Sequence, residues 1–436
     1  MHQREHHGKV EKLRSAILVA LVAATAMAVG LAWIALRVLS LVHGAGGLLH
    51  TVLITAYGVL VLIYLPTRII LYILYRPFPD RGFRPSITVV VPAYNEGPFI
   101  ARTLAAAVAA DYPASKKQIV VIDDGSTDDT AESVRQFMAA RPGALEFVRF
   151  ETNRGKRAAM AEGVRRATGE VVVFIDSDTV VDANALKYIV APFAHPRIGG
   201  ATGKVQVENR FTNFLTRMLG VRYIMSFDFY RCTASTYGGV NCLSGVISAY
   251  RRALLEEIIP RWQRQTFLGT TCTFGDDRSL TNCVLKAGYN TVYCRDAVAS
   301  TLAPETVSRL VRMLVRWNRS FVRESIILLK YLFDRRVIKK RKLLFFDSVL
   351  TCLLPFFMLS VVVTMYVKVV QQPLYGISVV ASVILMSLVY MLFYVRSEKD
   401  WQFVYGVAYA FFYISVLIWI LPFATLTLKR THWGTR

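Results

Sequence analysis

The stretch ITVVVPAYNEG, residues 87–97, joins a run of β-branched residues to a polar turn. The same pattern returns at residues 118–130 (QIVVIDDGSTDDT) and 170–179 (EVVVFIDSDT). Continuous β-branched runs that end in turn residues are typical of buried parallel strands. Segments with helical periodicity and one weaker strand lie between them, at residues 99–110, 130–140, 147–150 and 158–167. Strands and helices that alternate in this way predict an α/β domain with a mostly parallel sheet.

Long apolar segments lie on both sides of this domain. Two precede it, at residues 15–36 and 51–75, and three follow it, at residues 343–367, 374–395 and 401–428. A helix needs about 20 apolar residues to cross a bilayer core that is about 30 Å thick. Lys and Arg exceed Asp and Glu by 52 − 30 = 22, a balance that fits a nucleic-acid binder or a membrane protein. Because the cations follow the edges of the apolar segments, we predict a membrane protein that binds no nucleic acid.

The cations beside the first two apolar segments predict the orientation of the chain. Four precede the first segment, one lies between the two segments and three follow the second: Arg4, Lys9, Lys12, Arg14, Arg37, Arg76, Arg81 and Arg84. By the positive-inside rule, the N-terminus and the large middle region are cytoplasmic, in a protein of the plasma membrane. Three full spans at the C-terminal end would leave a basic tail outside. The last segment, which Pro422 interrupts, is therefore the candidate for a re-entrant or interfacial segment.

Five parts are expected along the chain: membrane helices in 1–80, an α/β domain in 81–303, amphipathic interface helices in 304–342, membrane helices in 343–428 and a tail in 429–436. Residues 209–236 also mix apolar and basic positions at helical spacing, which predicts contact with lipid headgroups. The alternative is an ordinary helix of the domain. The six cysteines include no pair spaced for zinc, and we expect buried thiols.

Acidic motifs follow two neighbouring strands. Asp176 and Asp178 are two residues apart after a buried strand, so both side chains are expected on one face. Carboxylates in this arrangement suit a hard divalent cation whose coordination shell is completed by phosphate oxygens. Asp124 ends the neighbouring strand. Ligands of such sheets bind beyond the carboxyl ends of the strands. We therefore expect a base or a ribose to donate a hydrogen bond to Asp124, Asn95 or Glu96.

Two polar turns near these motifs have alternative interpretations. Residues 123–129 can also form an ordinary Asp/Gly/Ser turn that leads into a helix capped by Ser126 or Thr127, and the two interpretations are compatible. Lys156 and Arg157 follow Gly155 at the start of a predicted helix, where cations and backbone N–H groups can meet phosphate. The alternative there is a solvated basic turn.

Two motifs further along the chain suggest an acceptor site. Residues 241–245 (NCLSG) either border a sugar pocket or simply end a strand. Asp276 and Asp277 can provide a general base that takes a proton from a hydroxyl group. Their alternative role is an ion pair with Arg278.

A tryptophan on the following amphipathic segment adds a flat apolar face. A sugar ring can rest on Trp317, with Arg316 beside it to pair with phosphate. The alternative is a membrane anchor. The final segment, residues 433–436 (WGTR), is a polar tail when considered by itself.

Eight motifs occur in a fixed order between the apolar segments: VVVPAYNE, VIDDGSTDDT, GKR, DSDT, NCLSG, FGDDR, RWNRSFVRES and WGTR. Together they resemble the processive family-2 glycosyltransferases, and among these the hyaluronan synthases most. The resemblance extends from about Leu60 to Arg436. It implies a GT-A catalytic domain of the α/β class, fused to an α-helical transmembrane domain with interfacial amphipathic helices. It also implies UDP-sugar substrates and Mn²⁺ or Mg²⁺ as the cofactor.

The resemblance implies a role for each motif. Asp277, with Asp276 beside it, would be the catalytic base, and Asp178 with Asp176 would hold the metal. Trp317 would be the acceptor platform. The residues expected to bind substrate are Asn95, Glu96, Asp124, Lys156, Arg157, Asp176, Lys204, Cys242, Ser244, Gly245, Arg278, Arg316, Trp317, Trp433 and Arg436.

The NCLSG segment resembles the priming segment of the family, and Trp433 with Arg436 resembles part of a loop that closes over UDP. Two positions depart from the family pattern. Met313 stands where QxxRW has its glutamine, and Val246 stands where SGP has its proline. These departures bear on product length and acceptor handling and leave the reaction type intact.

The expected function is polymerisation of UDP-GlcNAc and UDP-GlcA into hyaluronan by a monomer. The polymer is expected to pass between the C-terminal helices and the two N-terminal spans, and membrane lipids are expected around the helices. The nearest alternative is a chitin or chito-oligosaccharide synthase that uses UDP-GlcNAc alone. A cellulose-type synthase is disfavoured because the chain carries no appended regulatory domain. A non-enzymatic transporter or receptor is disfavoured because Asp178, Asp277 and Trp317 are all present.

Overall fold

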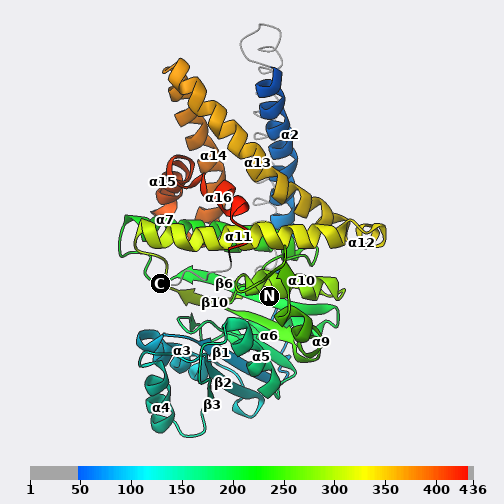
Figure 1. Cartoon of the computed structure of the whole chain (residues 1–436), viewed down its shortest axis with the longest axis vertical. Helices are drawn as coiled ribbons and strands as arrows, with labels where there is room; N and C mark the ends of the chain where they lie inside the picture. Colours follow the sequence, from blue (N-terminus) through cyan, green and yellow to red (C-terminus); the bar gives the residue numbers. More distant parts are fainter. Residues whose placement is uncertain (1–47, 431–436) are drawn as a thin grey trace, which may run out of the picture. The chain divides into compact units, whose positions relative to one another are not determined.

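The computed structural model describes residues 48–430, which form two compact units (Figure 1). The units consist of residues 48–75 with 338–418, and of residues 76–337 with 419–430. The predicted membrane segment at 15–36 and the tail at 431–436 lie outside the described residues.

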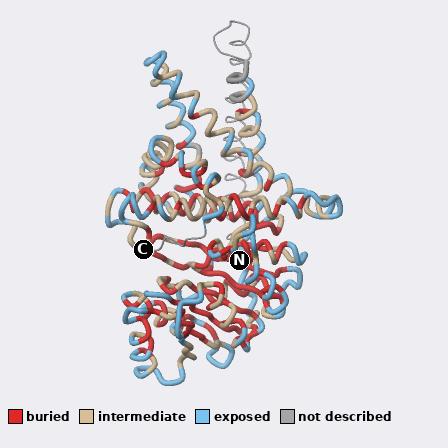
Figure 2. Tube along the Cα trace, in the orientation of Figure 1, coloured by how far each residue is buried: buried red, intermediate tan, exposed pale blue. Residues whose placement is uncertain are grey.

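The larger unit contains an eight-stranded sheet with the order β3-β2-β1-β4-β7-β6-β10-β5. The four strands β3, β2, β1 and β4 are parallel to one another, as predicted, and helices connect them along the chain. The elements of this half are β1 Ile87–Ala93, α3 Gly97–Ala109, β2 Lys117–Asp123, α4 Thr130–Ala140, β3 Glu146–Arg149, α5 Lys156–Arg166 and β4 Val171–Phe174. Every residue of β1 is buried, which is why the strand is an unbroken apolar run in the sequence (Figure 2).

The other four strands make the sheet mixed. β7 is antiparallel to both β4 and β6, β6 is parallel to β10, and β5 is antiparallel to β10. These strands are β5 Val180–Val181, β6 Ile198–Val207, β7 Ser248–Arg251 and β10 Asn290–Thr301. The prediction of a mostly parallel sheet therefore holds for the first half, whereas, in the part of the chain that the structure describes, β6–β10 is the one parallel pair in the second half.

Glycines explain why the sequence signal for the second half is weak. A Cβ atom on Gly203 of β6 would lie 2.1 Å from the carbonyl oxygen of Ala297 in β10. One on Gly200 would lie 2.5 Å from the Leu243 side chain. Close packing at these positions requires glycine, so β6 lacks the β-branched run that marks β1.

Shorter elements complete the larger unit: η1 Ala114–Lys116, α6 Ala185–Val190, η2 Ala191–Ala194, α9 Arg252–Gln263, β8 Thr266–Phe267, β9 Thr270–Thr271 and α10 Asp276–Lys286. β8 and β9 form a separate two-stranded hairpin between α9 and α10.

The amphipathic segment at residues 209–236 forms helices that pack on the sheet. α7 Phe214–Ile224 contacts β6, and α8 Tyr230–Ser235 contacts β10, with the π-helical turn Met225–Phe229 between them. This packing agrees with the alternative interpretation, a helix of the domain. Contact of its exposed residues, such as Phe214, with lipid stays a prediction.

One continuous helix follows the sheet. α11 Val307–Leu332 packs against α10 and against α16 Ile420–Leu426, and α12 Arg335–Lys340 comes next. Five buried residues of α11 recur at helical spacing along one face: Leu310, Leu314, Glu324, Leu328 and Leu332.

The smaller unit contains helices suited to a membrane. Within the described residues, three helices are long and apolar enough to cross one: α2 Leu48–Leu74 (over Thr55–Leu74), α13 Lys342–Gln371 and α14 Tyr375–Glu398. Arg68 of α2 forms an ion pair with Asp347 of α13 and lies over the ring of Tyr64. Pairing of this kind is what allows charged side chains within apolar helices.

The last apolar segment, the candidate for a re-entrant or interfacial segment, is broken. It consists of η4 Trp401–Phe403, α15 Val404–Phe412, the π-helical turn Tyr413–Leu417 and α16. Trp401–Leu417 and Ile420–Leu426 are long and apolar enough to cross a membrane only when they are taken together. The helix axis bends by 44° between them. The break precedes Pro422, which lies in the first turn of α16, where no intrahelical N–H bond is lost. This arrangement fits either a broken span or a re-entrant loop.

Gly169→Ala is expected to destabilise the larger unit by about 1–3 kcal/mol, the usual cost of overpacking a core. The new Cβ would lie 2.4 Å from the carbonyl carbon of Ile87, a backbone atom of β1. The midpoint of thermal unfolding in detergent should fall. Gly376→Ala is the control, because a Cβ there meets only the side chain of Val369 at 3.7 Å. Equal midpoints for the two variants would contradict the packing of residue 169 against β1.

Candidate active site

Three motifs meet at the end of β4. The Nζ atom of Lys156, at the start of α5, lies 2.5 Å from Oδ1 of Asp176, which follows β4. The backbone N–H of Asp176 donates to the carbonyl oxygen of Gly245 at 3.0 Å. A Cβ at residue 245 would lie 2.8 Å from Asp176 Oδ1 and 3.1 Å from Lys156 Nζ. The glycine of NCLSG is therefore needed for this close approach.

The second acidic motif reaches the same place through Asp277. Its Oδ2 atom accepts a hydrogen bond from the backbone N–H of Gly245 at 3.0 Å. Asp277 lies in the first turn of α10, where the helix dipole favours a negative charge. The turn before it requires Gly275, which has φ +78° and packs against Ser320 of α11. The site thus joins the loops after β4 and before β7 to the start of α10.

The electrostatics of this cluster favour a base at Asp277. Burial raises the pKa of Asp277, the Lys156 cation opposes that increase, and the Asp176 carboxylate adds to it. Burial by itself would lower the pKa of Lys156, but the charges of Asp176 and Asp277 outweigh it, and the pKa of Lys156 is raised. A carboxylate with a raised pKa beside a permanent cation is suited to accept a proton.

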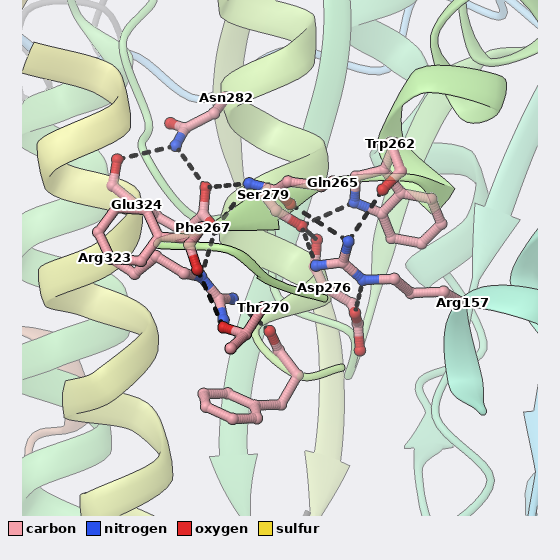
Figure 3. Close-up of polar contacts among 11 residues, drawn as sticks. Arg157, Trp262, Gln265, Phe267, Thr270, Asp276, Ser279, Asn282, Arg323 and Glu324 are labelled. Atoms are coloured by element: carbon pink, nitrogen blue, oxygen red, sulfur yellow. Dashed lines mark hydrogen bonds and ion pairs between the residues drawn. The ribbon is translucent and has the colours of Figure 1, made fainter. Parts of the chain in front are cut away.

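Asp276 faces the interior, unlike its neighbour. Its Oδ1 atom accepts from Nε of Arg157 at 2.7 Å, and both side chains are buried (Figure 3). The other guanidinium nitrogens of Arg157 donate to the carbonyl oxygen of Trp262 at 2.9 Å and to Ser279 Oγ at 3.1 Å. The alternative role suggested for the acidic pair was an ion pair with Arg278. Asp276 does form an ion pair with an arginine, but its partner is the distant Arg157.

Adjacent cations of the GKR turn therefore point in different directions. We expected Lys156 and Arg157 to meet phosphate together, but the structure places only the Lys156 ammonium group beside Asp176 and Asp277. Arg157 is held by partners on α9 and α10. The physical reason is that neighbouring residues on a helix project about 100° apart.

Asp124 shapes the turn that carries these cations. Its carboxylate oxygens accept from the backbone N–H groups of Arg154 at 2.7 Å and Gly155 at 2.9 Å. Burial raises the pKa of Asp124, against the effect of these two hydrogen bonds. Gly125 has φ +70°, and a Cβ on it would lie 2.5 Å from the backbone of Thr152.

Asn95 and Glu96 connect the loop after β1 to the loop after β2. Asn95 adopts φ +54°, donates its N–H to Ser126 Oγ at 2.9 Å and accepts from the Thr127 N–H at 2.9 Å. The N–H of Glu96 donates to Thr130 Oγ1 at 2.7 Å. Helix α4 begins at Thr130, so the predicted cap at Ser126 or Thr127 is wrong. Those residues are used to bind the neighbouring loop.

Asp178 is half-buried, and Thr301 at the end of β10 donates to its Oδ1 atom at 3.5 Å. Among residues 48–430, no group of three or more Asp, Glu, His or Cys side chains is arranged to hold a metal ion. A divalent cation here would have one or two carboxylates and complete its shell with phosphate and water. Mg²⁺ usually binds in this way.

The NCLSG segment is held by its backbone. Leu243 N–H donates to Thr281 Oγ1 at 3.0 Å, and Ser244 N–H donates to Thr202 Oγ1 at 3.2 Å. Burial raises the pKa of the Cys242 thiol, so the sulfur is protonated at neutral pH. Lys204 is buried in β6.

Trp317 lies on α11 and packs against the α7 region. Its ring centroid is 6.2 Å from that of Tyr223 and 6.4 Å from that of Phe227. The Tyr223 hydroxyl lies 3.8 Å from the sulfur of Met313, the residue that replaces the family's glutamine. Arg316 is half-buried beside Trp317. The predicted Trp433 and Arg436 lie outside the described residues.

The sequence analysis missed three polar residues next to the site, the half-buried Gln265 and the buried Arg323 and Glu324, whose contacts appear in Figure 3. One signal was available. Glu324 falls on the stripe of α11 that carries Leu310, Leu314 and Leu328, and a carboxylate at a core position indicates a buried partner.

Comparison with known proteins identifies the family. Residues 85–320, more than half of the chain, match the family described as "Glycosyltransferase like family 2". The chain is a family-2 glycosyltransferase. The predicted family and its GT-A fold are therefore confirmed.

Relatives of this glycosyltransferase include two kinds of named enzyme. An N-acetylglucosaminyltransferase of Azorhizobium caulinodans is 31% identical to it over 81% of this chain and 87% of the relative. A hyaluronan synthase of Streptococcus pyogenes is 31% identical over 87% of this chain and 90% of the relative. The mannosyltransferase from Pyrobaculum calidifontis, solved with GDP-Man and Mn²⁺, has the same fold. Its TM-score is 0.61 at 24% identity, over 84% of this chain and 98% of that chain.

The pH dependence of the glycosyltransferase should show the environment of Asp277. As the candidate base, Asp277 must be ionised to accept a proton, so its raised pKa predicts an acidic limb of kcat/KM above the ordinary aspartate value of 3.8. Lys156→Met removes a charge that lowers this pKa, so the limb should move further to higher pH, with a lower maximal rate. Release of nucleoside diphosphate across a pH series measures both effects.

Lys187→Met is the control for this series, because Lys187 forms a surface ion pair with Asp111. A limb that moves to lower pH in Lys156→Met, or moves equally in the control, would contradict the assignment.

Proposed function

We propose that this glycosyltransferase polymerises UDP-GlcNAc and UDP-GlcA into hyaluronan, processively and with inversion, and secretes the polymer through its own membrane helices. The observation that supports this proposal most is the convergence of Asp277 with the Lys156–Asp176 ion pair at Gly245. A carboxylate suited to act as a base and a cation suited to bind phosphate therefore lie close together beyond the ends of the parallel strands.

The donor is proposed to bind on the side of the first four strands. Asp124, Asn95 and Glu96 are proposed to contact the uridine, since they lie in the loops after β1 and β2. Lys156 would interact with the diphosphate. Arg157 is proposed to act indirectly, by holding Asp276.

Asp178, with Asp176, is proposed to hold Mn²⁺ or Mg²⁺. Both carboxylates follow β4, and their hard oxygen atoms are the donor type that these ions prefer. Such an ion would neutralise charge on the diphosphate when bound.

Asp277 is proposed to act as the general base. Its carboxylate takes the proton of the acceptor hydroxyl group, whose oxygen attacks C1 of the donor sugar as the bond between C1 and the diphosphate oxygen breaks. Lys156 stabilises the charge that develops on the leaving group. Attack opposite the leaving group inverts the configuration at C1.

The acceptor is proposed to lie between NCLSG and α11. Trp317 would be the platform for the acceptor sugar, and Arg316 would face the diphosphate. The remaining residues proposed to bind substrate are Lys204, Cys242, Ser244, Gly245, Arg278, Trp433 and Arg436. Because burial raises the pKa of the Cys242 thiol, we propose that it contacts the acceptor and does not attack the donor.

The membrane helices suggest how the product leaves. Three candidate spans and a broken fourth lie in the described residues. We propose a monomer in the plasma membrane, with its catalytic domain in the cytoplasm and lipids around the helices. The Lys and Arg residues beside the first two apolar segments support this orientation.

A second candidate function is supported by the relatives. Enzymes named N-acetylglucosaminyltransferase are as similar to this chain as the hyaluronan synthases are, at 31% identity. The alternative is therefore a chitin or chito-oligosaccharide synthase that uses UDP-GlcNAc alone.

We expect sustained UDP release only when detergent-purified protein receives both UDP-GlcNAc and UDP-GlcA with Mn²⁺, and a polymer that hyaluronidase degrades. Full release with UDP-GlcNAc alone and a product that chitinase degrades would instead establish the second candidate. No release under any of these conditions would refute both proposals.

Asp277→Asn should reduce transfer by at least about 100-fold, because general-base catalysis typically contributes a factor of 10²–10⁴. Binding of UDP, followed by calorimetry, should change little because the amide has the same shape. Asp296→Asn is the matched control, since Asp296 is exposed on β10. Comparable activity in the two variants would show that another group is the base.

A further inference from the structure

Two buried ion pairs lie behind the candidate active site, and one glutamine connects them. Arg157 pairs with Asp276, and Nε of Arg323 donates to Glu324 Oε1 at 2.9 Å. Oε1 of Gln265 accepts from Nη1 of Arg157 at 3.2 Å. Nε2 of Gln265 donates to the two carboxylate oxygens of Glu324 at 3.1 and 3.3 Å (Figure 3). The carboxamide is suited to this role because it has an acceptor for the cation and a donor for the anion.

The pairs belong to different helices of the site. Arg157 is on α5, Asp276 begins α10, and Glu324 is on α11. Asn282 of α10 donates to the Glu324 carboxylate and to its carbonyl oxygen, each at 3.0 Å. Nη2 of Arg323 donates to the carbonyl oxygen of Phe274, just before the acidic motif. The network therefore holds the start of α10 from both sides.

Burial makes this arrangement sensitive to any missing partner. The side chains of Arg157, Asp276, Arg323 and Glu324 are 9%, 3%, 4% and 2% exposed. Buried charges are stable only when each is paired and hydrogen-bonded, and a network with one member missing is worse than none. Gln265 is held in turn by its backbone, since its carbonyl oxygen accepts from the Cys272 N–H at 3.0 Å across the β8–β9 hairpin.

The network connects the proposed base to the proposed acceptor platform. Asp277 is the residue after Asp276, and Trp317 lies about two turns before Glu324 on the same helix. A shift between α10 and α11 would change the position of the base relative to the acceptor hydroxyl. Misplacement by about 1 Å can reduce a rate about 100-fold.

We propose that Gln265 is a positioning residue for glycosyl transfer, which holds α10 and α11 in one register by bridging the Arg157–Asp276 and Arg323–Glu324 pairs. This inference rests on the proposed function, because it needs Asp277 as the base and α11 at the acceptor. It assigns Gln265 no contact with substrate.

The experiment compares full-length detergent-purified variants by kcat, by KM for each UDP-sugar and by the midpoint of thermal unfolding. Gln265→Leu should reduce kcat at least about 10-fold at temperatures where it is folded, with KM for the donors within about twofold. Gln263→Leu is the matched control, because Gln263 is an exposed glutamine two residues earlier. It should retain wild-type values.

An exchange of the two side chains tests the bridge itself. Gln265→Glu places a second carboxylate beside Glu324, and Glu324→Gln removes the anionic partner of Arg323, so each single variant should lose kcat. The double variant Gln265→Glu/Glu324→Gln keeps the total charge. It gives Arg157 a carboxylate at position 265 and gives that carboxylate an amide donor at position 324. Because Arg323 still lacks its anionic partner, the double variant should recover only part of the lost kcat, and a double-mutant cycle measures this coupling directly.

Three results would overturn this inference and leave the proposed function standing. They are a wild-type kcat in folded Gln265→Leu, a change in KM without a change in kcat, and a loss of kcat that disappears after correction for the unfolded fraction. A double variant whose kcat is no higher than that of the less active single variant would also overturn the inference. Failure of the wild-type protein to transfer any sugar would instead refute the proposed function, and this inference with it.

Discussion

Repulsion between carboxylates is the constraint on which the site depends. Asp176 and Asp277 come from different motifs yet share the cation of Lys156. The Asp176 charge raises the pKa of Asp277, which shows that the two carboxylates repel each other. Without a shared cation, that repulsion would separate the loop after β4 from the start of α10. Lys156 prevents this, and the next residue, Arg157, holds Asp276 in the interior.

Adjacent cations can hold both motifs because α5 begins where they meet. The first residue of the helix points toward the β4 loop, and the second points toward α9 and α10. Asp124 sets the position of this turn through two hydrogen bonds to its backbone. A residue that the sequence suggests as a ligand for nucleotide thus also builds the loop that carries the cations. Both tasks are compatible, since each carboxylate oxygen can accept more than one hydrogen bond.

Helix α11 relates the site to the rest of the larger unit. It packs against α10 through Ser320 and the Arg323–Glu324 pair, and against α16 through Arg319, whose Nε donates to Thr427 Oγ1 at 3.0 Å. Trp317 lies on the same helix. A continuous helix of 26 residues transmits position over several turns, because its backbone hydrogen bonds allow little bending. The proposed base on α10 and the proposed acceptor platform on α11 are therefore related through the contacts between these two helices.

The sequence by itself determined the α/β order, the apolar helices and the motifs of the site, because β-branched runs, apolar segments and polar strand ends are local patterns. It identified Asp277 and Lys156 as candidates. Only the family resemblance singled out Asp277, because the local residue pattern could not tell Asp276 from Asp277 or Lys156 from Arg157. That distinction depends on which side chain finds a buried partner, and Arg157 and Asp276 are 119 residues apart. The antiparallel strand β7 and the bridge at Gln265 were decided by tertiary structure alone, since strand pairing and buried hydrogen bonds join segments that share no local pattern.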